Sequence, residues 1–127
     1  FAFKRFVTMA PLPLSANTST TATIVPVLDR AIRVTRLRFF TSAAQASSSD
    51  GWTFAVKYDD GAGGASTSTA SFTTTGNAIA ASNSYSSSAT VVDVAAGKRL
   101  FLAARAVNAV AAANAMTITC SVEYDEA

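Results

Sequence analysis

Residues 116–125 constrain the fold most strongly, because apolar and polar side chains alternate over the whole segment. The apolar positions are Met116, Ile118, Cys120, Val122 and Tyr124. A β-strand with one buried face needs this period of two, whereas a helix repeats every 3.6 residues and cannot use it. The segment therefore predicts a β-strand that packs one face against a core.

The same pattern and the intervening turn residues predict seven further strands and no convincing helix. In one of them the apolar parity changes between Val34 and Leu37, which predicts a β-bulge near Thr35 and Arg36. The predicted strands cover residues 5–9, 20–28, 31–41, 52–59, 69–74, 89–94, 99–107 and 116–125. They indicate an all-β, antiparallel β-sandwich, with an eight-stranded jelly roll expected and an immunoglobulin-like sandwich as the alternative.

The chain length of 127 residues predicts one domain, which we place at residues 20–127 behind an extended N-terminal arm at residues 1–19. Pro11 and Pro13 favour extended backbone in this arm. Its aromatic residues Phe1, Phe3 and Phe6 would then anchor it on a neighbouring subunit. The other interpretation is an edge strand near residues 5–9 that pairs with the domain's own sheet.

Charge is scarce and unevenly distributed. Ala, Ser and Thr make up 58 of the 127 residues, and a weakly charged surface is typical of one that neighbours cover. The first 40 residues hold six basic side chains against Asp29 alone, whereas residues 108–127 hold only acidic ones. These ends can pair between copies of the chain or within one copy.

Three arginines, Arg33, Arg36 and Arg38, follow one strand and are candidates to bind acidic groups on neighbouring subunits. The alternative is a solvated strand face. Nucleic acid is not an expected partner, because the net charge is only +2 and no aromatic side chains interleave with these arginines.

The composition disfavours catalysis and metal binding, so we expect neither an enzyme nor a cofactor. There is no His, and the one Cys, Cys120, falls on an apolar strand face. Acid–base chemistry would need Asp50, Asp59, Asp60 and Asp93 to converge. Residues 59–64 are interpreted as a turn, with a calcium site as the alternative. No signal peptide and no apolar run long enough to span a bilayer is apparent, so no membrane partner is expected.

Residues 76–88 are interpreted as a long polar surface loop in which Tyr85 is a candidate contact residue. If the protein bound carbohydrate, Trp52 and Tyr85 would be the aromatic side chains to stack on a sugar ring. Trp52 lies on a strand face that is predicted to be core, which argues against it.

Three stretches carry a resemblance to a known class of protein. They are residues 31–40 (AIRVTRLRFF), residues 91–102 (VVDVAAGKRLFL) and the strand at 116–125. Their layout resembles small β-sandwich proteins of virus particles, especially the head-decoration and minor capsid subunits of tailed bacteriophages. A similar layout occurs in adhesins and carbohydrate-binding modules.

The resemblance implies a non-enzymatic structural protein of the virion, such as a decoration, cement or minor capsid subunit. It further implies a homo-oligomer, with a trimer as one expected form, and contacts with other capsid proteins. A carbohydrate-binding or adhesion module, for example in a tail fibre, is the alternative function.

Overall fold

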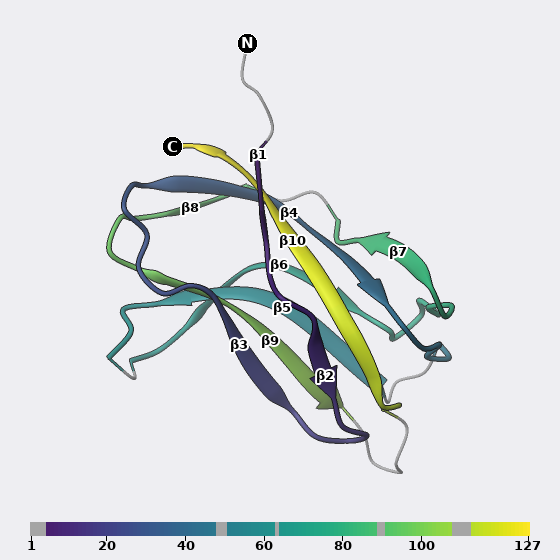
Figure 1. The fold of residues 1–127 in the computed structure, drawn as a ribbon. Helices are drawn as coiled ribbons and strands as arrows, with labels where there is room; N and C mark the ends of the chain where they lie inside the picture. The colour runs from purple at the N-terminus through teal and green to yellow at the C-terminus, as the bar shows by residue number, and fades with distance from the viewer. Residues whose placement is uncertain (1–4, 48–50, 63, 89–90, 108–112) are drawn as a thin grey trace.

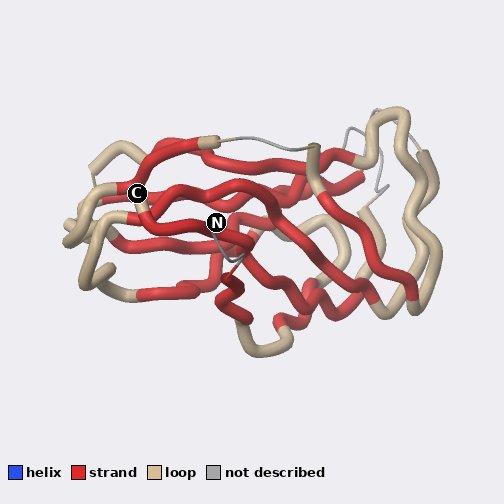
Figure 2. Tube along the Cα trace, turned by 90° about the horizontal axis from the view of Figure 1, so that it is seen from above, coloured by secondary structure: helices blue, strands red, loops and turns tan. Residues whose placement is uncertain are grey.

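The computed structural model describes residues 5–47, 51–62, 64–88, 91–107 and 113–127, and these ranges contain strands and loops without a helix (Figure 1, Figure 2). Two antiparallel sheets pack against each other, so the predicted β-sandwich is confirmed. The larger sheet contains β1 (Arg5–Thr8), β2 (Leu12–Leu14), β4 (Ile32–Thr41), β7 (Asn83–Ser86), β8 (Val92–Val94) and β10 (Met116–Glu126). The smaller sheet contains β3 (Thr20–Val25), β5 (Gly51–Asp59), β6 (Thr67–Thr73) and β9 (Arg99–Val107).

The strand order is that of a jelly roll in which two strands are interrupted. β1 and β2 both pair with β10, and β7 and β8 both pair with β4. If each of these pairs counts as one strand, the larger sheet has the order 1-8-3-6 and the smaller sheet 2-7-4-5. This is the order in which a jelly roll winds its eight strands through two sheets. The eight-stranded prediction therefore agrees with the structure once both breaks are recognised.

The bulge predicted in β4 is present. Arg36 pairs with Glu123 and Val34 pairs with Tyr124, so Thr35 is the extra residue. Because of this extra residue, Val34 and Leu37 are both buried although they lie three positions apart. Without it, the side chains beyond the bulge would turn to the opposite face of the sheet.

Residues 5–14 of the predicted N-terminal arm do not form a separate arm in the structure. These residues form β1 and β2 and pair with β10 of the same sheet (Figure 1). Pro11 lacks the N–H that a continuous ladder needs, which accounts for the break between β1 and β2. The edge-strand interpretation therefore holds for this segment. Phe1 and Phe3 lie outside the described residues.

The predicted loop at residues 76–88 also contains regular structure. Asn83–Ser86 forms β7 beside β4, and Ile79 makes an isolated bridge with Gln45. The break between β7 and β8 lies opposite the bulge in β4, since β7 pairs with residues 38–41 and β8 with residues 32–34.

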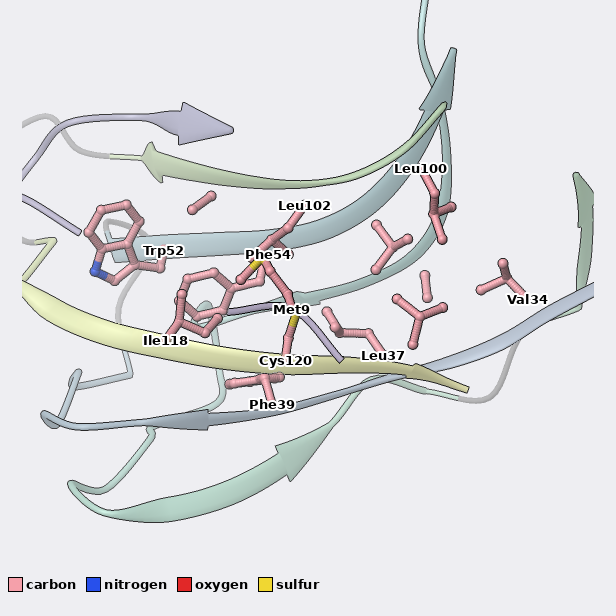
Figure 3. Packing of buried hydrophobic residues seen from close by; sticks show 14 of the residues in the cluster. Met9, Val34, Leu37, Phe39, Trp52, Phe54, Leu100, Leu102, Ile118 and Cys120 are labelled. Atoms are coloured by element: carbon pink, nitrogen blue, oxygen red, sulfur yellow. The ribbon is translucent and has the colours of Figure 1, made fainter. Parts of the chain in front are cut away.

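The hydrophobic core fills the space between the two sheets (Figure 3). The ring centroids of Phe39 from β4 and Phe54 from β5 lie 5.2 Å apart, and this tilted contact joins the sheets. Cys120 is buried in the same core, as its position in the alternating strand predicts. Burial raises the pKa of its thiol to about 12, so the thiol is protonated at neutral pH and lacks the character of a nucleophile.

We expect the core to respond strongly to small cavities. Val56 in β5 is fully buried, whereas Val27 is 65% exposed. Val56→Ala should lower the free energy of unfolding by about 1.5–3 kcal/mol, because buried methyl groups lose their apolar contacts. Val27→Ala removes the same atoms and should change it by less than about 0.5 kcal/mol. Urea unfolding of both variants measures the difference, and equal effects would contradict the assigned sandwich core.

Candidate functional site

The outer face of the larger sheet is the most distinctive surface in the described structure. Beyond the bulge, β4 directs Arg36, Arg38 and Phe40 away from the core. The strand register places Thr119 and Ser84 on either side of Phe40. The same register places Ser121 and Ser86 on either side of Arg38. One row across the sheet thus places the ring of Phe40 between two hydroxyl groups. The neighbouring row places the guanidinium of Arg38 between two hydroxyl groups.

These rows line an open depression of ≈370 Å³. Its lining consists of Arg38, Phe39, Phe40, Ser84, Tyr85, Ser86, Thr119 and Ser121. Phe40 supplies the exposed apolar surface, since 40% of it is accessible to solvent. Phe40 is not among the contact residues predicted from the sequence, although the shared parity of Leu37 and Phe39 already indicates that Phe40 faces outward.

The buried carboxylate of Glu123 binds two side chains of β4 on this face. Glu123 of β10 is only 6% exposed. Arg38 Nε donates a hydrogen bond to Glu123 Oε2 at 3.0 Å, and Thr35 Oγ1 lies 3.4 Å from Oε1. Thr35 Oγ1 also donates to the Glu123 carbonyl at 3.1 Å. Thr35, the extra residue of the bulge, thus binds β10. The buried carboxylate of Glu123 has hydrogen-bond and ion-pair partners, as a buried charge requires.

The two other charged contacts of β4 also stay within the chain. Arg33 Nε donates to Asp93 Oδ1 of β8 at 2.8 Å, and this contact lowers the pKa of the Asp93 carboxyl. Arg36 donates to Ser86 Oγ at 3.3 Å and to the Ser87 carbonyl at 3.2 Å. All three candidate arginines therefore have partners in their own subunit.

The two oppositely charged ends of the sequence meet in the same way. Arg5 and Arg30 each lie 3.1 Å from Glu126 Oε1. Basic side chains from the first part of the chain thus pair with acidic side chains of β10. Pairing within one copy, which is one of the two interpretations of the charge distribution, is therefore present in the structure.

The candidate acidic residues do not gather at one place among the described residues. Asp59 in the smaller sheet accepts two hydrogen bonds from Arg99, at 3.0 and 2.6 Å, whereas Asp93 in the larger sheet binds Arg33. Asp59 and Asp60 also accept hydrogen bonds from Gly61 N and Ala62 N, as expected for a turn. Asp50 lies outside the described residues. Within the described ranges no group of three His, Cys, Asp or Glu side chains is placed to hold a metal ion.

The aromatic candidates have different environments. Trp52 is 1% exposed, and its Nε1 donates to the Asn114 carbonyl at 2.8 Å, so it is a core residue. Tyr85 is half-buried and stacks on Phe39 at 5.7 Å between ring centroids, with its hydroxyl accepting a hydrogen bond from Ala80 N. Phe6 on β1 is 51% exposed and remains accessible. Trp52 therefore offers no ring face to a sugar, and one ring face of Tyr85 is covered by Phe39.

A second, smaller depression of ≈320 Å³ lies beside β1. Its apolar lining consists of Val7, Val25, Leu28, Ile32, Leu100 and Tyr124. Arg5, Asp29, Arg30 and Glu126 surround it. It therefore combines an apolar interior with a rim whose charges already pair with one another.

Comparisons with known proteins add no relatives. A scan against protein-family models finds no matching model, and searches of curated proteins and of solved structures find no significant match. The described residues include no helix able to cross a membrane.

The ion pair between Asp59 and Arg99 predicts a specific loss of stability in acid. The hydrogen bond from Arg99 holds the pKa of Asp59 below its ordinary value of 3.8. The folded state therefore binds a proton at Asp59 less readily than the unfolded state does. The ion pair stabilises the fold fully above about pH 4, and this stabilisation is lost as the pH falls through the lowered pKa of Asp59. Asp59→Asn should lower the melting temperature at pH 7 and should have a smaller effect at pH 2.

Asp60→Asn is the matched control, because Asp60 is exposed and an Asn side chain can accept the same hydrogen bond from Ala62 N. This variant should follow the unmodified protein across the pH series. If Asp59→Asn lowered the melting temperature equally at pH 7 and pH 2, the ion pair would not be the source of the effect.

Proposed function

We propose that this chain is a non-enzymatic structural subunit of a virion, of the decoration, cement or minor capsid type, which assembles with copies of itself. The observation that carries the proposal is the open edge at β1. This edge strand bears the half-exposed ring of Phe6 and lies beside the ≈320 Å³ apolar depression.

An edge strand beside an apolar pocket is the arrangement by which proteins bind an added strand. Among the described strands none pairs with β1 on the side away from β10, so its main chain offers N–H and C=O groups there. The pocket, with Val7 and Leu28 in its lining, offers space for an apolar side chain of the incoming strand. Phe6 adds exposed aromatic area of the kind that dominates binding energy at protein interfaces.

The fold and the surface composition agree with this function. Jelly rolls recur in viral capsid domains, although a fold alone does not determine function. The charged pairs close within the chain, so subunit contacts would depend on apolar and main-chain groups. A surface rich in Ser, Thr and Ala with few free charges is what such contacts require.

We expect Phe6→Asp to break the assembly. A carboxylate in a desolvated contact costs more than the lost aromatic area alone, so association should weaken by at least about tenfold. Sedimentation velocity at several protein concentrations should then show a shift towards the monomer. Circular dichroism should report an unchanged strand content, because Phe6 packs on the outer face.

Val91→Asp is the matched control, since Val91 is 66% exposed and lies before β8, away from β1. It should leave the sedimentation profile unchanged. Electron micrographs of the unmodified protein should show closed, symmetric assemblies. A strictly monomeric unmodified protein, or equal effects of both substitutions, would overturn the proposal.

A further inference from the structure

The depression on the outer face of the larger sheet has a chemical character of its own, distinct from the β1 edge. Phe40 stands between the hydroxyl groups of Thr119 and Ser84, and neither hydroxyl forms a hydrogen bond within the described residues. Adjacent strands lie about 4.8 Å apart, so this row is about 10 Å wide. An exposed aromatic face is thus flanked on both sides by groups free to donate and accept hydrogen bonds.

The next row adds a positioned cation. Arg38 lies two residues from Phe40 along β4, a separation of about 7 Å. Its Nε donates a hydrogen bond to the buried carboxylate of Glu123, and no other hydrogen bond or ion pair of its guanidinium occurs in the described part of the chain. The two Nη groups therefore remain available to a ligand. A carboxylate is the group that their paired geometry binds best.

Local charge supports the same ligand. Arg36 and Arg38 both point outward from β4, and Glu123 forms an ion pair with Arg38. Arg36 is occupied with Ser86 and the Ser87 carbonyl, so it adds positive potential without competing for the ligand. The guanidinium of Arg38 thus lies beside the aromatic ring of Phe40 in the lining of the depression.

We propose that this depression binds an acidic sugar, a pyranose that carries a carboxylate. One apolar face of the sugar ring would lie on Phe40, its hydroxyl groups would pair with Thr119 and Ser84, and its carboxylate would bind Arg38. The open shape of the depression suits one unit of a longer glycan chain better than a fully enclosed small molecule. This site is independent of the assembly proposed for the β1 edge.

The direct test is titration of the isotope-labelled protein with trisaccharides of galacturonic, glucuronic and mannuronic acid, followed by NMR. At least one acidic trisaccharide should shift the amide signals of residues 38–40, 84–86 and 119–121. The corresponding neutral hexose trisaccharides should bind at least about tenfold more weakly, because they lack the group that pairs with Arg38.

Two substitutions assign the contacts. Phe40→Ala and Arg38→Lys should each weaken binding by about tenfold or more, since one removes the platform and the other removes the planar fork. Lys keeps a positive charge near Glu123, and a thermal melt of Arg38→Lys verifies that the fold persists. Val27→Ala and Arg105→Lys alter an exposed apolar and an exposed cationic side chain away from this depression and should leave sugar binding unchanged.

Several outcomes would overturn the site. They are the absence of shifts with every trisaccharide, equal binding of acidic and neutral sugars, and retention of binding in Phe40→Ala. Preferential binding of a single-stranded oligonucleotide at these residues would overturn it as well. The two proposals fail separately, because Phe6→Asp tests the assembly and Phe40→Ala tests the binding of the sugar.

Discussion

The pairing of β4 with β10 is the interaction on which the larger sheet depends. β10 also holds β1 and β2, and β4 also holds β7 and β8, so every strand of this sheet pairs with one of the two. The bulge at Thr35 lets β4 keep apolar residues on the core side along its whole length. Thr35 then bonds to Glu123 across the ladder, so the irregularity is itself part of the pairing.

This pairing also determines what the surface can do. Glu123 and Glu126 on β10 bind Arg38, Arg5 and Arg30. Arg33 and Arg99 likewise form ion pairs within the chain, with Asp93 and Asp59. Two depressions in the described surface, one beside the β1 edge and one at Phe40, offer space for a partner. The two proposals follow from these surfaces.

Much of this architecture was predictable from the sequence, because side-chain parity records which face of a strand is buried. Residues 52–59 and 116–125 show that parity directly, and the change between Val34 and Leu37 predicts the bulge. β2 and β7 escaped prediction because their sequences, LPL and NSYS, are too short and too polar or proline-rich to show a pattern.

The charged contacts and the outer depression were harder to predict. Glu126 is far from Arg5 in sequence, and only the jelly-roll winding brings both to one edge of the sandwich. The neighbours of Arg38 on the outer face likewise depend on the register of three strands, which the sequence alone does not provide. Tyr85 looks like a loop residue in sequence, yet its ring packs on Phe39 because β7 pairs with β4.

The most direct test of this account is the molar mass of the unmodified protein by light scattering after size exclusion, at low and at high salt. If the ion pairs close within each chain and assembly uses the β1 edge, the mass should be that of an oligomer and should not fall as salt increases. A mass that falls towards the monomer with added salt would show that charged groups join the subunits, and would contradict the account.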